Sequence, residues 1–407
     1  MIGVAEALDI ILARVSAAGI ERVMISQACG RIIAEDVVSG VNIPPLDNSA
    51  MDGYAVRGAG LAALPARLKV IGDLPAGSRW NGALGPGEAL RIMTGAPLPD
   101  GADTVIKQEL TRRDGHYVEI LEREGAAHIR RAGEDIAAGD RVIASGTRLR
   151  PAHLGVLASI KKTIVSVYRQ PQVAILSTGD ELVDIDGDAG DGRIVNSNSY
   201  TLAALVQEAG ATPRMLGIAR DSADDLRAHF DHALHADIIV SSGGVSVGDY
   251  DFVKDVLRDM GAEMSLWKVA MRPGRPLAFG TIGSRPAFGL PGNPVSAMVS
   301  FEQFVRPAIR KMCGLRSLFR CTLTAVADEP VDTAQGLTCF VRCRVRREAG
   351  QYRARVTGAQ GSGILMSMAE ANALMIVPAD AAGVRAGDRV AVQILDPEFD
   401  MSADHPF

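Results

Sequence analysis

The sequence predicts a multidomain protein of the α/β and β classes, in which a central, open and mostly parallel α/β sheet is flanked by β-rich domains. From Gln172 onward, strand–loop–helix units alternate, and this order is typical of a parallel sheet with helices on both faces. Before and after that region, short strand patterns alternate with glycine and proline turns. Helical periodicity marks the N-terminus, where Val4, Leu8, Ile11 and Val15 share one face.

The 407 residues are enough for several domains. We expect a helical and extended segment from residues 1–40 and 140–170, a β-rich domain at 41–139, the α/β domain at 171–318, and a C-terminal β-barrel-like domain at 319–407. The pentapeptide AGDRV occurs at 138–142 and again at 386–390, and we interpret it as a turn that leads into a strand.

Helix boundaries in the α/β region are predicted from individual residues. Gly210 ends the helical stretch SNSYTLAALVQEA, and Ser222 with Asp225 forms a capping box at the start of the next helix. Asn293 is expected as the N-cap of a helix whose first residue is Pro294.

Composition and charge exclude several classes of protein. A net charge of −5 argues against a general nucleic-acid binder, and no apolar stretch reaches the length of a membrane span. The five cysteines lack zinc-ligand spacing, and Cys339 and Cys343 lie in a strand-like segment, so we expect buried thiols in a reducing cytoplasm.

Four predicted strand ends carry unusual loops, at 177–181, 220–221, 241–251 and 291–296. Ligands of parallel sheets bind beyond the carboxyl ends of the strands, and glycine loops let backbone N–H groups approach an anion. One such loop is also an ordinary tight turn, but several at one sheet edge indicate a phosphate site. The glycine spacing of GGVSVG (243–248) matches neither the Walker motif nor the dinucleotide fingerprint.

Carboxylates occur at the same strand ends. Each one has an ordinary alternative role as a helix cap or a first-turn charge, and Asp249 fits that role well. Phosphate and carboxylate repel each other unless a cation lies between them, so Glu181, Asp221 and Asp251 predict a hard divalent ion, most simply Mg²⁺.

A second anion site is predicted at WKVAMRPGRPLAF (267–279), where Lys268, Arg272 and Arg275 surround a proline turn. Ordinary surface charge is the alternative. The few histidines are scattered along the sequence, so they do not indicate nucleophilic catalysis. The residues therefore indicate metal-assisted transfer or cleavage at a phosphate.

Six motifs lie in one order along the chain: PLDNSAMDGYAVR (45–57), RIMTGAPLP (91–99), IRRAGEDI (129–136), STGDEL (177–182), SSGGVSVGDYD (241–251) and LPGNPVSA (290–297). Together they resemble the MoeA family of molybdopterin molybdenumtransferases, which includes the C-terminal domain of gephyrin. The resemblance covers nearly the whole chain. The α/β domain alone is also similar to MogA-type adenylyltransferases and CinA-like proteins.

The resemblance implies that adenylylated molybdopterin and molybdate are the substrates. Molybdenum would be inserted with Mg²⁺-dependent cleavage of the pyrophosphate bond, which releases AMP and molybdenum cofactor. It also implies a cytoplasmic homodimer in which the helical and extended segment serves dimerisation, and it makes the molybdopterin adenylyltransferase a candidate partner. Neither nucleic acid nor a membrane is expected as a partner.

Site residues follow from the same motifs. The resemblance implies catalytic roles for Asp52, Thr94, Arg130, Asp135, Glu181, Asp221, Asp251 and Lys268, the first four reaching the site from the other subunit. Substrate binding is expected at Thr178, Gly179, Ser241, Gly243, Gly244, Ser246, Pro291, Gly292, Asn293 and Pro294. Molybdate would bind at Arg272, Arg275, Ser296, Arg342 and Ser362.

Lysines are common in the family at the two positions that Arg272 and Arg275 occupy here, so the positive charge is kept but the donor geometry differs. Three other functions stay open from the sequence. They are an adenylyltransferase acting on ATP and molybdopterin, a non-enzymatic scaffold like the gephyrin domain, and a CinA-like nucleotide hydrolase.

Overall fold

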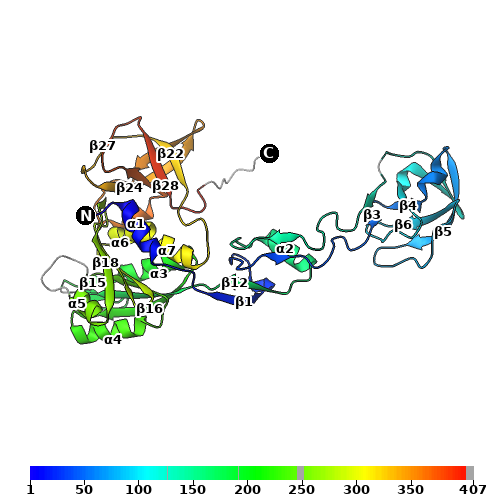
Figure 1. Cartoon of the computed structure of the whole chain (residues 1–407). Helices are drawn as coiled ribbons and strands as arrows, with labels where there is room; N and C mark the ends of the chain where they lie inside the picture. Colours follow the sequence, from blue (N-terminus) through cyan, green and yellow to red (C-terminus); the bar gives the residue numbers. More distant parts are fainter. Residues whose placement is uncertain (126, 191, 245–251, 400–407) are drawn as a thin grey trace. The chain divides into compact units, whose positions relative to one another are not determined.

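The computed structural model describes residues 1–125, 127–190, 192–244 and 252–399 (Figure 1). The chain forms two compact units, one from Met1–Glu21 with Tyr168–Phe407 and one from Arg22–Val167. The chain therefore passes from one unit to the other twice, and each unit is described by itself below.

The larger unit contains a six-stranded sheet in the order β16 (Thr212–Ala219), β13 (Gln172–Thr178), β17 (Ile238–Ser242), β21 (Arg285–Leu290), β20 (Pro276–Ile282) and β18 (Ala262–Lys268). The first four strands are parallel, as predicted, and β20 runs antiparallel to both of its neighbours, β21 and β18. The antiparallel pair β20–β21 follows from its connection, because only Gly283 and Ser284 separate the two strands, and a two-residue turn joins antiparallel neighbours.

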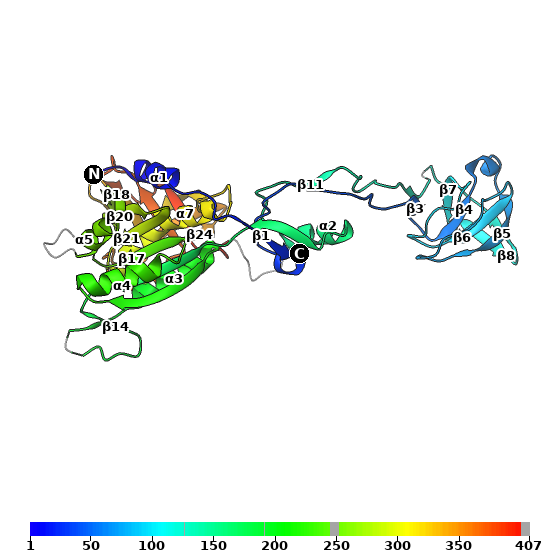
Figure 2. The same ribbon diagram turned by 60° about the horizontal axis from the view of Figure 1, so that its bottom comes forward.

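Helices cover both faces of this sheet (Figures 1 and 2). Alternate residues of β13 point to opposite faces, so Val173 and Ile175 belong to one apolar cluster and Ala174 and Leu176 to another. The first cluster includes residues of α1 (Val4–Ala13), α3 (Ser197–Ala209), α6 (Pro294–Ser300) and α7 (Arg306–Met312). Residues of α4 (Ala223–Ala233) and α5 (Phe252–Asp259) complete the second cluster.

The position of α1 differs from the prediction, which grouped residues 1–40 with 140–170. Ala7 and Ile11 are fully buried in the core of the α/β sheet, and Leu8 packs against that core. The predicted apolar face is correct, but a periodic pattern does not specify which partner covers it. Only residues after about Arg22 share a core with the 140–167 stretch.

The predicted helix ends lie at the expected residues, but only some of the expected capping hydrogen bonds are formed. Gly210 has the left-handed conformation that ends α3, and Ser222 Oγ accepts from the Asp225 N–H at 3.4 Å. The Asp225 carboxylate binds the N–H of Arg220 instead of returning to Ser222, so the capping box is only half formed. Asn293 is at the N-cap of α6, but its side chain makes no capping bond with the described residues.

A closed β-barrel follows the α/β part. Its strands pair in the ring β24 (Thr338–Glu348), β25 (Gln351–Val356), β22 (Thr322–Ala327), β28 (Arg389–Ile394), β26 (Ala373–Val377) and back to β24. The short strand β19 (Met271–Arg272) leaves the α/β part and pairs with β24. Two further elements decorate the barrel, the pair β23 (Val331–Asp332) with β27 (Gly383–Val384) and helix α8 (Leu365–Ala369).

A buried ion network ties the barrel to the α/β part. Arg320, just before the barrel, donates two hydrogen bonds of 3.0 Å to the carboxylate of Glu302, which lies in the π-helical turn η4 (Phe301–Val305) between α6 and α7. Arg320 also reaches Glu208 of α3 at 2.7 Å and the carbonyl oxygen of Leu395, at the exit of the barrel, at 2.7 Å. The entry and the exit of the barrel are thus anchored by one guanidinium.

The smaller unit contains a second six-stranded sheet in the order β7 (Thr104–Lys107), β4 (Gly53–Val56), β6 (Glu88–Ile92), β5 (Ala66–Leu74), β9 (Tyr117–Ile120) and β8 (Thr111–Asp114). A separate core contains α2 (Pro151–Ser159) and the strand pair β2 (Val37–Val38) with β11 (Arg141–Ile143). Other short pairs are β3 (Asn48–Ser49) with β10 (Ile129–Arg130), and β1 (Ile20–Met24) with β12 (Ile164–Tyr168). The domain limits predicted from the sequence stay predictions.

Both AGDRV segments form the same turn, as expected. Asp140 Oδ2 accepts from the N–H of Ala137, and Asp388 Oδ2 accepts from the N–H of Arg385, each at 2.8 Å. A strand begins at Arg141 in the first copy and at Arg389 in the second. The five thiols are free. Cys339 and Cys343 are buried as expected, whereas Cys29 and Cys321 are exposed.

No helix among the described residues combines the length and the apolar character needed to cross a lipid bilayer.

Candidate active site

Three parallel strands end side by side and bring the glycine loops together. Ser177 of β13 pairs with Ser242 of β17, which pairs with Leu290 of β21. The loops that follow therefore begin at the same edge, and the N–H of Gly243 donates to the carbonyl oxygen of Leu290 at 3.1 Å. This edge is the carboxyl end of the strands, where parallel sheets bind ligands.

Two adjoining cavities open at this edge, one of about 480 Å³ and one of about 340 Å³. Five residues line both: Thr178, Glu181, Gly243, Gly292 and Asn293. The larger cavity continues to the first turn of α3 and to the pair β14 (Leu182–Val183) with β15 (Ile194–Val195). The smaller one continues to Asp221 and Gly244.

Two of the loop glycines are required by the geometry. Gly243 has a φ of +92°, and a Cβ there would lie 2.5 Å from the carbonyl oxygen of Thr178. Gly179 has a φ of +143°, and a Cβ there would lie 2.5 Å from Oε2 of Glu181. Any other residue would have to displace backbone in the first case and the carboxylate of Glu181 in the second.

Negative charge gathers in the smaller cavity. Glu181 and Asp221 line it, and the N–H of Asp221 donates to Asp180 Oδ1 at 3.3 Å. Burial raises the pKa of Asp221, and the charges of Asp180 and Glu181 raise it further. Asp180 was not among the residues predicted for the site, because its neighbour Glu181 carries the motif resemblance.

These carboxylates fit a magnesium ion in number and type. No group of three potential metal ligands occurs among the described residues, but Mg²⁺ takes one or two carboxylates together with phosphate oxygens and water. Glu181 and Asp221 supply two oxygen donors beside the glycine loops, where burial and the charges of Asp180 and Glu181 raise the pKa of Asp221. The third predicted ligand, Asp251, lies outside the described residues, as does Ser246.

A second site lies where β19 joins the barrel. Arg272 pairs with Cys339 of β24, and both line a cavity of about 90 Å³ together with Arg342. Arg342 is 1% exposed and donates to Ser367 Oγ at 3.0 Å and to the carbonyl oxygen of Gly361 at 2.9 Å. Burial lowers the pKa of Arg342, and the charge of Arg272 lowers it further.

This small cavity therefore has an excess of positive charge. The acceptors of the Arg342 guanidinium in the described part of the chain are neutral oxygens. Asp332 also lines the cavity, but no ion pair connects it to either arginine among the residues described. A buried charge without a counter-ion is costly, so an anion bound here would stabilise the folded protein.

The other predicted molybdate residues lie near this site but do not line the cavity. The N–H of Val295 donates to the carbonyl oxygen of Ser362 at 3.1 Å, which brings Ser362 next to Ser296 at the start of α6. Arg275 is exposed, and its Nε lies 3.3 Å from Sδ of Met1. Lys268 is the last residue of β18, opposite Pro276.

The four predicted residues of the N-terminal half lie in the smaller unit. Asp52 Oδ1 accepts from both the N–H and the hydroxyl of Thr94, each at 2.7 Å, and these bonds lower the pKa of Asp52. Arg130 pairs through its backbone with Asn48, and the N–H of Asp135 donates to Ile43. The structure thus joins Asp52 to Thr94 directly, but it shows no side-chain hydrogen bond or ion pair of Arg130 or Asp135 within the described chain.

Several cavity residues were missed by the sequence analysis. Asn196, Asn198 and Ser242 form the polar floor of the larger cavity, and Ile194 and Val195 form an apolar wall. The stretch NSNS (196–199) carries more polar residues than one helix cap needs, and this excess is the signal that could have identified them.

Three domain families match successive parts of the chain. Residues 2–160 match the MoeA N-terminal region (domain I and II), residues 174–311 match a probable molybdopterin binding domain, and residues 324–395 match the MoeA C-terminal region (domain IV). These matches define the class of the protein, a multidomain protein of molybdenum cofactor biosynthesis.

Whole-chain comparisons identify the family. The molybdopterin molybdenumtransferase of a Nostoc species is 40% identical over 90% of this chain and 86% of its own length, and that of Haemophilus influenzae is 37% identical over 92% and 93%. Two crystal structures of the molybdopterin biosynthesis MoeA protein of Pyrococcus horikoshii superpose with TM-scores of 0.86 and 0.82, at 30% and 29% identity. They cover 97% of this chain and 99% and 100% of theirs. The chain belongs to the MoeA family of molybdopterin molybdenumtransferases.

The raised pKa of Asp221 gives a prediction about stability. The folded state binds the Asp221 proton more tightly than the unfolded chain, so ionisation costs stability as the pH rises through the folded pKa. Asp221→Asn should therefore raise the melting temperature at neutral pH in EDTA, and the gain should shrink as the pH falls toward the ordinary value of 3.8. Thermal unfolding followed by circular dichroism measures both.

Asp237→Asn is the matched control. Burial raises the pKa of Asp237, but the hydrogen bonds from Arg169 and from the N–H of Gln172 outweigh it, and the net pKa is lowered. This variant should lower the melting temperature at neutral pH. A melting temperature that falls for Asp221→Asn as well would show that its carboxylate is stabilised by its surroundings.

Proposed function

We propose that this chain inserts molybdenum from molybdate into adenylylated molybdopterin, with Mg²⁺-dependent cleavage of the pyrophosphate bond and release of AMP. The observation that carries the proposal is that one compact unit contains two cavities of opposite charge. One is the glycine-lined edge with Glu181 and Asp221, and the other is the small cavity with Arg272 and the buried Arg342. A reaction that joins a phosphorylated substrate to a second anion needs both.

The residues of the chain have separate roles in this proposal. Gly179, Gly243 and Gly292 leave room for the phosphate groups because none of them carries a Cβ. The N–H group of Gly292 is the candidate donor to a phosphate oxygen, since those of Gly179 and Gly243 bind the carbonyl oxygens of Ala219 and Leu290. Glu181 and Asp221 hold the magnesium ion, which when bound neutralises the charge that develops on the leaving phosphate. Arg272 and Arg342 hold the tetrahedral dianion and offset its repulsion from the nearby phosphates.

The first test is product formation. The purified protein, incubated with adenylylated molybdopterin, molybdate and Mg²⁺, should release AMP, and EDTA should abolish the release. Glu181→Gln should lower turnover on the order of a hundredfold, because one oxygen ligand becomes a neutral amide. AMP quantified by chromatography is the measurement.

Full activity in EDTA, or in Glu181→Gln, would contradict the magnesium role. Pyrophosphate release from ATP and molybdopterin would identify an adenylyltransferase instead, and hydrolysis of ADP-ribose would identify a CinA-like hydrolase. A protein inactive with all of these substrates would be left with a scaffold role.

Arg272 and Arg275 should contribute differently to the affinity for molybdate. Both arginines are exposed, but Arg272 lines the small cavity and Arg275 does not. Losing a charge-assisted contact costs roughly 1.5–3 kcal/mol, so Arg272→Ala should raise the half-saturating molybdate concentration about ten- to a hundredfold. Arg275→Ala is the matched control from the same turn and should raise it less. Equal effects would place the oxyanion outside the small cavity.

We propose further that the protein is a homodimer with composite sites. This is supported by the separation of Asp52 and Thr94 from the glycine loops, since the two sets lie in different compact units and both match motifs of the family. Asp52→Ala and Glu181→Ala subunits, each inactive alone, should recover about a quarter of wild-type activity after random exchange, because half of the dimers are mixed and each has one intact site of two. Proven exchange without recovered AMP release would exclude shared sites.

The same proposal places the reaction in the cytoplasm and makes an adenylyltransferase the source of the substrate.

A further inference from the structure

Asn198, the second residue of α3, holds a fixed and incomplete set of hydrogen bonds. Its side chain lines the larger cavity and is only 9% exposed as a residue. Nδ2 donates to Ser242 Oγ at 2.7 Å and to the carbonyl oxygen of Gly292 at 2.8 Å. The amide thereby connects α3 to the loops after β17 and β21.

These two bonds fix which way the amide faces. A backbone carbonyl oxygen only accepts hydrogen bonds, so the nitrogen of Asn198, and not its oxygen, must face Gly292. Both amide hydrogens are then used. Oδ1 of Asn198 is buried and has no hydrogen-bond partner among the residues described.

A second acceptor on the same cavity is also unpaired. Oγ1 of Thr178 is buried without a hydrogen-bond partner in the described structure, and Thr178 lines the cavity beside Asn198. A buried polar atom left unpaired costs about 1–3 kcal/mol. Both atoms belong to residues that line one cavity, so a ligand that completed their hydrogen bonds there would recover this cost.

The opposite wall of the cavity is apolar. Leu182, Ile194 and Val195 contribute it, from the β14–β15 pair and the arm that extends away from the sheet (Figure 2). Ile194 is 55% exposed and Val195 41% exposed, which leaves their side chains free to contact a ring. The volume of about 480 Å³ lies in the range of small-molecule sites.

We propose that Asn198 Oδ1 accepts a hydrogen bond from the amino or imino N–H of a bicyclic heterocycle whose face lies on Ile194 and Val195. Asn198 is then a substrate-binding residue that reads the donor edge of the ring. This deepens the proposed function and rests on it, because adenylylated molybdopterin carries two such heterocycles, a pterin and an adenine. Both present an amino group, and the test below separates them.

The test measures the affinity of ligands for the full chain by calorimetry, under conditions in which no reaction takes place. AMP is compared with purine riboside monophosphate, which lacks the amino group, and 6-hydroxymethylpterin is compared with its 2-deamino analogue. For the ring that occupies this cavity, loss of the amino group should weaken binding about tenfold, because Oδ1 is left unpaired again. A loss confined to AMP assigns adenine to the cavity, and a loss confined to the pterin assigns the pterin.

Variants give the protein side of the same test. Asn198→Leu keeps the size of the side chain and removes the acceptor, so it should weaken the same ligand about tenfold. Ser177→Ala is the matched control. Ser177 is buried beside the same helix start and bonds Asn196 Oδ1 at 2.9 Å, but it lines neither cavity. This variant should lose stability and keep ligand affinity.

Equal affinities for every ligand and its deamino analogue would overturn the proposal, as would absence of binding at millimolar concentration. Equal losses in Asn198→Leu and Ser177→Ala would reduce Asn198 to a structural role and also overturn it. The ligand comparison uses the wild-type chain and so does not depend on whether Asn198→Leu folds. Amino-dependent binding without AMP release in the turnover assay would contradict the proposed function alone.

Discussion

The parallel alignment of β13, β17 and β21 is the constraint on which the candidate site depends. Their register puts three loops at one edge, and the loops approach so closely that Gly243 meets the carbonyl of Thr178 where any side chain would clash. The crossover helix α3 begins at the same edge and inserts Asn198 between the second and third loops. Cavities, carboxylates and polar floor all follow from this one arrangement.

Among the described residues, the charged groups of the two candidate sites differ from the buried ion network in how they are paired. Glu302 and Arg320 are buried, but each finds its opposite charge at 3.0 Å. Arg342 is equally buried and has neutral acceptors, and Asp221 has carboxylate neighbours that raise its pKa. An excess of positive charge in one cavity and of negative charge in the other lowers stability without ligands. This is the pattern expected where a protein binds an anion and a cation separately.

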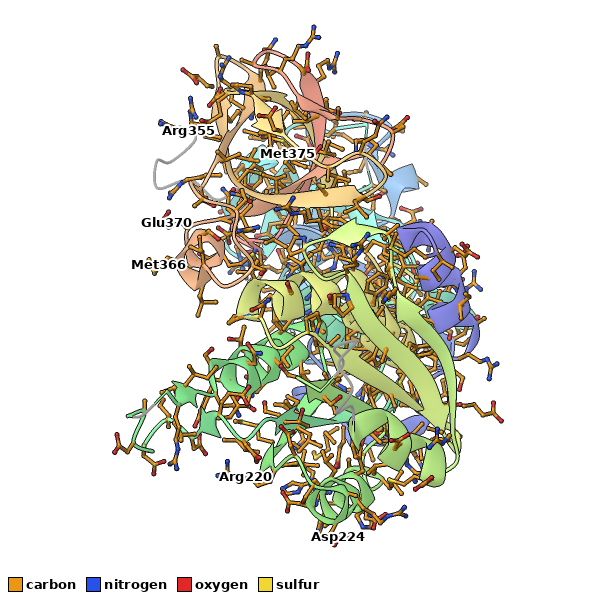
Figure 3. All side chains as sticks on the ribbon, turned by 90° about the vertical axis from the view of Figure 1, so that its left-hand side faces the viewer. Arg220, Asp224, Arg355, Met366, Glu370 and Met375 are labelled. Atoms are coloured by element: carbon orange, nitrogen blue, oxygen red, sulfur yellow. The ribbon has the colours of Figure 1, made fainter. Side chains whose placement is uncertain are left out.

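The closed barrel takes part in the site because β19 is one of its neighbours. The chain enters the barrel sheet for two residues, from Met271 to Arg272, long before the barrel strands themselves begin. That short excursion places Arg272 opposite Cys339 and near Arg342, although seventy positions separate the two arginines in the sequence. Between β25 and β26, α8 carries the outward-pointing Met366, and Glu370 follows at the end of the helix on the surface of the same unit (Figure 3).

The sequence alone determined the features that depend on near neighbours. Alternating strands and helices, the left-handed end of α3 at Gly210 and the two AGDRV turns are local, and the structure contains them as predicted. It could not determine that α1 packs on the α/β sheet, because an apolar face fits many partners. Nor could it show that Asn293 makes no cap bond within the described part of the chain, or that Asn198 has both amide hydrogens occupied while its oxygen has no partner there. Hydrogen-bond satisfaction depends on atoms brought together from distant segments, so only the tertiary structure decided it.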